Sequence, residues 1–173
     1  MQAVMKIILS IAFLLCLLYP LWRSRAIRKK RHHRKQEQAR RIINRLADIP
    51  AFPQKIAYLR KVDPFTFEEI VLEGFERKGF RVIRNKRYTG DGGIDGKVII
   101  DSGTCFLQAK RYTGYISPSH VNAFSKLCEA HNTRGFFCHT GKTSKPLMKK
   151  IKTSDRIIIV SGKLLINLIS IEG

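Results

Sequence analysis

The sequence predicts an α/β domain with a mixed central sheet flanked by helices, preceded by one transmembrane helix. Three observations predict this. The N-terminus contains an uncharged apolar run; helical and strand patterns succeed one another after residue 63; and a very apolar run near the C-terminus is typical of a buried parallel strand. With 173 residues, of which 44% are hydrophobic, the chain can bury a core, which excludes wholesale disorder.

The N-terminal run extends from Ile7 to Trp22 without a charged residue. As a helix it would rise about 24 Å, slightly less than the ~30 Å hydrocarbon core of a bilayer. Lys6 and Arg23 can reach the interface at its two ends, where Tyr19 and Trp22 are also favoured. A secretory signal peptide is the alternative, but no small-x-small cleavage site follows. We therefore expect residues 4–22 to be a transmembrane anchor.

Residues 23–62 form a basic juxtamembrane arm and a helical connector that Pro50 and Pro53 interrupt. Between residues 23 and 45, eleven basic side chains stand against Glu37, a local net charge of +10. Positive residues favour the cytoplasmic side, so we expect a single-pass protein of the inner or cytoplasmic membrane with its C-terminal domain in the cytoplasm. The arm has two compatible interpretations: a topology signal that binds anionic lipid, which we favour, or an arm that holds DNA.

The whole chain is strongly basic. It contains 33 Lys and Arg against 13 Asp and Glu, a formal net charge of +20. Polyanions are the partners that such a charge favours, either nucleic acid or an anionic membrane face. Residues 46–173 carry +9 of this charge, so the domain is basic even without its arm.

The third region, residues 63–173, begins with a helix at Asp63-Pro64, since Pro is favoured in the first helical turn. An apolar stripe of helical spacing continues to Gly79. Two strands are predicted next, over 80–88 and 94–100. A hairpin turn at 101–103 then leads to a third strand over 104–111.

The rest of this region alternates between helices and strands. Ser117-Pro118 opens a helix, and residues 134–139 form a strand. A short helix over 144–152, an apolar strand over 156–160 and a helix over 162–169 complete the domain. Three cysteines lack metal-site spacing, so we expect them to pack as small hydrophobic side chains: Cys105, Cys128 and Cys138.

Polar residues converge on the hairpin of the second and third strands. Because side chains alternate along a strand, Gln108 and Lys110 share one face. The hairpin brings Asp95 close to them, beside a glycine-rich loop over 90–93. Gly92 and Gly93 would let a phosphate backbone approach closely.

Each of these groups suits the hydrolysis of a phosphodiester bond. Asp95 offers a hard oxygen ligand for Mg²⁺, with Mn²⁺ as a substitute, and Gln108 offers a neutral carbonyl oxygen. Lys110 can lower the pKa of an attacking water or balance charge on the phosphate. A fourth group can come from Glu68 or Glu69 in the first helix of the domain, and the residues alone leave this choice open.

Four motifs resemble those of the Mrr-type restriction endonuclease domain, a member of the PD-(D/E)xK nuclease superfamily in its Gln-x-Lys variant. They are Phe67-Glu68-x-x-Val71, Lys78-Gly79-Phe80, Gly90-Asp91-Gly92-Gly93-Ile94-Asp95 and Gln108-Ala109-Lys110-Arg111. The resemblance covers roughly residues 63–170 and implies a restriction-endonuclease-like fold. It also implies catalytic roles for Asp95, Gln108 and Lys110, with Glu68 selected over Glu69 and a supporting role for Asp91. Ser161 departs from the family, which usually has Asp there.

We therefore expect a membrane-anchored, divalent-metal-dependent DNA endonuclease, for which restriction of foreign or modified DNA is one role. The alternatives are a non-cleaving module that tethers DNA to the membrane and a small membrane protein whose domain binds another protein. DNA and membrane lipid are the expected partners, and a homodimer is one alternative for the oligomeric state. Phosphate contacts are expected from basic side chains around the site: Lys86, Arg87, Arg111, Lys97, Lys142 and Lys145.

Overall fold

The computed structural model describes residues 1–85, 93–101 and 103–170. Its helices are α1 (Gln2–Ala47), α2 (Phe52–Leu59), α3 (Pro64–Arg77), α4 (Pro118–Ala130), α5 (Lys145–Ser154) and α6 (Gly162–Ile169). Its strands are β1 (Arg81–Arg84), β2 (Gly96–Ile100), β3 (Gly103–Lys110), β4 (Gly135–His139) and β5 (Ile157–Ser161). The chain divides into two compact units, Met1–Arg34 and Lys35–Gly173.

The N-terminal unit is helical from Gln2 onwards, as part of α1. The anchor expected over residues 4–22 falls on this helix, and many of its side chains lie outside the described residues. Among the residues that the structure describes, no helix is both long and apolar enough to cross a membrane.

The last turns of α1 and the whole of α2 belong to the folded C-terminal unit. Four residues of α1 are buried in the core of that unit: Ala39, Ile42, Ile43 and Leu46. From α2, Ile56 and Leu59 join the same core. The segment expected as a connector therefore supplies apolar surface that the domain buries.

Helix α3 starts where the sequence predicts. Asp63 caps it by accepting a 3.1 Å hydrogen bond from the backbone N–H of Thr66, which satisfies a free donor of the first turn. Lys35 adds an ion pair of 2.9 Å to the same carboxylate. The helix ends at Arg77, and Gly79 leaves it with a φ of +85°, a conformation that glycine adopts readily.

The five strands form one mixed sheet in the order β1-β2-β3-β4-β5. The pairs β1/β2 and β2/β3 are antiparallel, and β3/β4 and β4/β5 are parallel. The parallel placement predicted for the apolar strand over 156–160 is confirmed. The predicted order of helices and strands after residue 63 also agrees with the structure.

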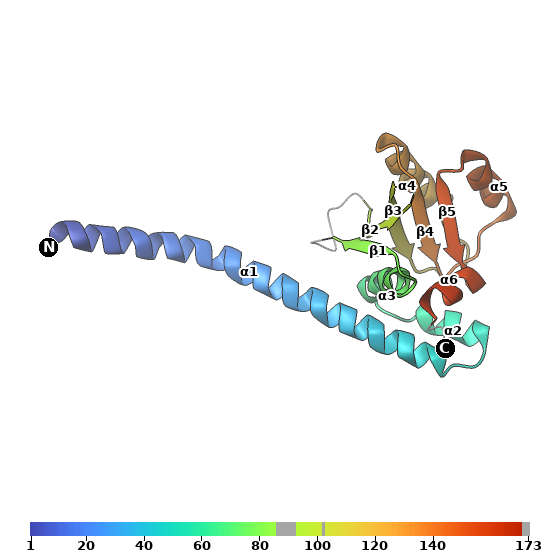
Figure 1. The fold of residues 1–173 in the computed structure, drawn as a ribbon, viewed down its shortest axis with the longest axis horizontal. Coiled ribbons are helices and arrows are strands. Elements are labelled where there is room, and N and C mark those ends of the chain that lie inside the picture. The colour runs from blue at the N-terminus through green and yellow to red at the C-terminus, as the bar shows by residue number, and fades with distance from the viewer. Residues whose placement is uncertain (86–92, 102, 171–173) are drawn as a thin grey trace. The chain divides into compact units, whose positions relative to one another are not determined.

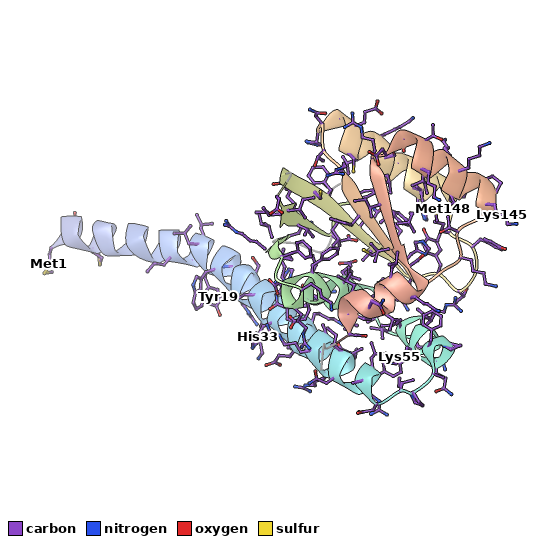
Figure 2. The ribbon with its side chains drawn as sticks, turned by 45° about the vertical axis from the view of Figure 1, so that its right-hand side comes forward. Met1, Tyr19, His33, Lys55, Lys145 and Met148 are labelled. Carbon is purple, nitrogen blue, oxygen red and sulfur yellow. The ribbon has the colours of Figure 1, made fainter. Side chains whose placement is uncertain are left out.

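Helices cover both faces of the sheet (Figures 1 and 2). Helices α4 and α5 pack on one face through Val121, Phe124, Leu147 and Ile151. Helices α3 and α6 pack on the other face, together with α2 and the last turns of α1. The three cysteines expected in the interior are buried.

Candidate active site

Strands β2 and β3 separate at Asp95, and this fork organises the candidate site. Gly96 is the first residue of β2 and lies opposite Leu107. Just before it, the backbone N–H of Asp95 donates a 2.8 Å hydrogen bond to the carbonyl of Leu107. The carboxylate of Asp95 then accepts a 2.7 Å hydrogen bond from the N–H of Ala109. The strand predicted from Ile94 therefore begins at Gly96, because a side chain takes the next place in the ladder.

Gln108 lies directly beside this fork. Its side chain is buried, and Nε2 donates a 2.5 Å hydrogen bond to the carbonyl of Gly93. Among the described residues, its Oε1 is buried without a hydrogen-bond partner. Gly93 has a φ of +90°, and a Cβ there would lie 2.8 Å from Nε2 of Gln108. Glycine at position 93 thus makes room for Gln108.

Lys110 ends strand β3 and is partly exposed. Alternation along the strand puts it on the same face as Phe106 and Gln108. Leu107 and Ala109 pack into the core on the opposite face. The predicted division of the side chains of β3 between two faces is confirmed.

Glu68, on α3, joins this group electrostatically. Burial raises the pKa of its carboxyl to about 8, and the nearby charges of Asp95 and Glu69 act in the same direction. The charge of Lys110 acts in the opposite direction. Glu68, Asp95 and Lys110 therefore lie close enough to influence one another's charge, although they come from α3, the residue before β2 and the end of β3.

Glu69, the other candidate on α3, is held by a different partner. It is buried, and its carboxylate forms a 2.8 Å ion pair with Nε of Arg84 on β1. Arg84 also pairs with Glu76 at 2.5 Å and with Glu73 at 3.7 Å. Opposite charges raise the pKa of the Arg84 guanidinium despite its burial. The three- and four-residue spacing of Glu69, Glu73 and Glu76 puts them on one helix face, which is the signal that the sequence offered for this cluster.

The oxygen atoms at the fork fit a hard divalent cation. In the part of the chain that the structure describes, no group of three or more His, Cys, Asp or Glu side chains could hold a metal ion. The predicted set has two carboxylates and one amide, and Mg²⁺ accepts so few protein ligands because it retains several waters. A cation would also offset the repulsion from Asp95 and Glu69 that adds to the effect of burial on the pKa of Glu68, and it would give Oε1 of Gln108 a partner.

The expected phosphate contacts are distributed around the domain. Gly92, Lys86 and Arg87 lie outside the described residues. Nη1 of Arg111 donates a 2.9 Å hydrogen bond to the carbonyl of Arg60, which joins α2 to the end of β3. Lys142 and Lys145 are exposed, and Figure 2 shows Lys145 at the start of α5.

His139 is a buried residue near the site that was not among the predicted site residues. It lies opposite Lys110 in the parallel β3/β4 ladder, between the rings of Phe137 and Tyr112. Burial lowers the pKa of its imidazole to about 4, so it is neutral at physiological pH. Its position at the end of an apolar strand was visible in the sequence, but its burial was not.

The architecture agrees with a comparison to known families. Residues 59–169 match the Mrr_cat family, described as restriction endonuclease. The chain belongs to this family. It therefore carries a restriction-endonuclease-type nuclease domain, and the predicted resemblance is confirmed at that level.

One relative in sequence and one solved structure of similar fold accompany this match. The type IV methyl-directed restriction enzyme EcoKMrr of Escherichia coli (strain K12) is 30% identical over 118 residues, which are 64% of this chain and 39% of that enzyme. The chain thus matches well under half the length of that enzyme. Among solved structures, MspJI restriction endonuclease in complex with a 27-mer oligonucleotide has a similar fold. Its TM-score is 0.54 at 21% identity, over 69% of this chain and 32% of that one.

Proposed function

We propose that this protein is a divalent-metal-dependent DNA endonuclease that hydrolyses phosphodiester bonds at the fork between β2 and β3. The observation that supports it best is the hydrogen bond from the N–H of Ala109 to the carboxylate of Asp95. Because Ala109 lies between Gln108 and Lys110 in sequence, this bond holds the carboxylate beside both residues. Membership of a restriction endonuclease family supports the same chemistry. Mg²⁺ is the proposed ion, with Mn²⁺ as a substitute.

Each residue of the site has a proposed role. Asp95 and Glu68 would bind the cation with carboxylate oxygens, and Gln108 with the amide oxygen Oε1. When bound, the cation supplies positive charge that stabilises the phosphate oxygens in the transition state. Lys110 would place its ammonium beside the attacked phosphate and balance the negative charge that develops there.

The hydrogen bonds around these residues support the proposed roles in binding the cation. Asp95 and Gln108 are each held by a backbone group, through Ala109 and Gly93 respectively. Their oxygens are therefore fixed before substrate arrives, and this lowers the cost of ordering the site during the reaction.

Plasmid DNA provides the direct test. Purified protein should nick or cut supercoiled plasmid with Mg²⁺ present and should leave it intact with EDTA. Cleavage that persists in EDTA, or no cleavage by the wild-type chain with either Mg²⁺ or Mn²⁺, would contradict the proposal. Plasmids prepared with and without methylated bases would then test a role in the restriction of foreign or modified DNA.

We also propose that residues 4–22 attach the protein to the inner or cytoplasmic membrane, with the nuclease domain in the cytoplasm. The uncharged run Ile7–Trp22 and the basic cluster after it support this orientation. The protein should sediment with membranes and stay there in high salt, since screening charge does not release a buried apolar helix. Digestion of the nuclease domain by protease added outside intact cells would overturn the orientation.

A further inference from the structure

A basic hollow lies at the start of β3, which is the end of the strand away from Lys110. It has a volume of about 590 Å³ and is lined by β2, the first residues of β3, the turn between α4 and β4, and the residue before β5. Three cationic side chains contribute to it: Lys97, Arg134 and Arg156. Within the described part of the chain, no carboxylate lines this hollow. Its chemistry therefore suits an anion.

Backbone hydrogen bonds hold the three cationic residues around the hollow. Lys97 lies opposite Phe106 in the β2/β3 ladder. The N–H of Phe106 donates a 3.0 Å hydrogen bond to the carbonyl of Arg134, and the N–H of Gly135 donates one of 2.9 Å to the carbonyl of Arg156. The cations thus come from segments that the sheet fixes relative to one another, and like charges held together in this way create a positive potential that an anion can relieve.

The side chains in the hollow favour contacts with phosphates over contacts with bases. Nζ of Lys97 lies 5.4 Å from the centre of the Phe106 ring, a cation–π contact, and among the described residues no carboxylate lines the hollow beside it. Nη1 of Arg156 donates a 3.4 Å hydrogen bond to Oδ1 of Asn132, a neutral partner. The ring of Phe106 is buried, so it cannot stack on a base. Recognition here would read charge and not sequence.

The hollow lies on the same face of the sheet as Gln108 and Lys110 of the candidate site. Phe106, Gln108 and Lys110 alternate onto the same face of β3, and Lys97 lies opposite Phe106. Phe106 and Lys110 are four residues apart, about 13 Å along a strand. A DNA duplex, which rises about 3.4 Å per base pair, covers that length in about four base pairs.

We infer that this hollow binds backbone phosphates of the same DNA duplex, a few base pairs from the bond that is cut. The choice of DNA as the ligand depends on the proposed function, whereas the affinity for a polyanion depends only on the charges of the hollow. The contact is independent of sequence and fixes how the duplex lies along β3.

Salt dependence of DNA binding tests this inference. A fluorescent 20-base-pair duplex would be titrated with full-length protein at several salt concentrations, in EDTA and with Lys110→Ala in every variant, so that no cutting occurs. Replacing Lys97, Arg134 and Arg156 together by Gln should reduce the log–log salt slope by about 2 to 3, since each neutralised phosphate contributes about 0.9. The matched control replaces three exposed lysines elsewhere by Gln, Lys126, Lys149 and Lys163, and should change the slope by less than about 1.

If the triple variant misfolds, Lys97→Gln alone keeps the test valid, because it leaves the hydrogen bond of Arg156 intact. This single variant should reduce the slope by about 1. Equal slopes for the hollow variants and the control would overturn the inference. The outcome is separate from that of the proposed function: a wild-type chain that never cuts plasmid, but whose binding weakens in the hollow variants alone, would overturn the endonuclease and support the phosphate site.

Discussion

The carboxylate of Asp95 accepts a 2.7 Å hydrogen bond from the backbone N–H of Ala109. In an antiparallel ladder that donor would ordinarily meet a backbone carbonyl of the neighbouring strand. Here the side chain of Asp95, the residue before β2 begins at Gly96, accepts the hydrogen bond instead. The main chain of β3 thereby fixes an acidic oxygen beside Gln108 and Lys110, and the site depends on a fork in the sheet.

Lys110→Ala should abolish plasmid cleavage while it changes DNA affinity by only a few fold. An ammonium that stabilises charge in the transition state contributes little to ground-state binding. Nicking assays and fluorescence anisotropy measure the two effects. Lys149→Ala is the control, because Lys149 is exposed on α5 and has no expected role at the site. Cleavage at the wild-type rate would remove Lys110 from the site.

Asp95→Asn should weaken Mn²⁺ binding at least tenfold, since a neutral amide is a poorer ligand for a hard cation than a carboxylate. Asparagine can still accept the hydrogen bond of Ala109 through its amide oxygen, so the fork should persist. Isothermal titration calorimetry reports the affinity, and circular dichroism checks the fold. An unchanged Mn²⁺ affinity would place the ion elsewhere.

Glu68→Gln should mainly impair cleavage, whereas Glu69→Gln should mainly impair stability. Glu68 carries a pKa raised to about 8 beside Asp95, so Glu68→Gln should lower cleavage by tenfold or more without loss of stability. Glu69 is buried against Arg84, so Glu69→Gln leaves a buried charge with one partner fewer and should destabilise the fold by roughly 1 to 3 kcal/mol. Cleavage rates and urea unfolding separate the two. Greater loss of cleavage from Glu69→Gln in a folded protein would reverse the assignment.

A fragment that starts at Lys35 should be more stable than one that starts at Leu46. The shorter fragment lacks Ala39, Ile42 and Ile43, which are buried in the core. Burial of two isoleucines alone contributes about 1.5 to 3 kcal/mol each, enough to lower the midpoint of urea unfolding clearly. Equal midpoints would show that the last turns of α1 contribute nothing to the domain.

The contribution of His139 to stability should fall as the pH is lowered through the range between about 6.5 and 4. His139 is buried with a pKa lowered to about 4, whereas an unfolded histidine titrates near 6.5. In that window the unfolded His139 binds a proton that the folded His139 does not, so its contribution to the free energy of unfolding drops by up to about 1.4 kcal/mol per pH unit. The raised pKa of Glu68 acts in the opposite direction, so the comparison is made between the variant and the wild type. His139→Phe should remove this contribution, with urea unfolding at pH 7 and pH 5 as the measurement. An identical pH dependence in the variant would mean that His139 titrates normally.

The sequence by itself determined the order of elements after residue 63 and the two faces of β3. Both follow from local periodicity: a period of 3.6 for the stripe that ends at Gly79, and a period of 2 that separates Leu107 and Ala109 from Gln108 and Lys110. Its glycines, prolines and Asp63 marked several boundaries because they act within a few residues of themselves. The family motifs added the choice of Glu68.

Only the tertiary structure decided which partner each of these residues meets. The pairing of Glu69 with Arg84, the burial of His139 and of the last turns of α1, and the gathering of Lys97, Arg134 and Arg156 around one hollow all join segments far apart in the chain. Likewise, nothing in the pattern around residue 94 showed that β2 would begin only at Gly96. That start depends on the energy of a hydrogen bond between Asp95 and Ala109, which exists only once the hairpin has closed.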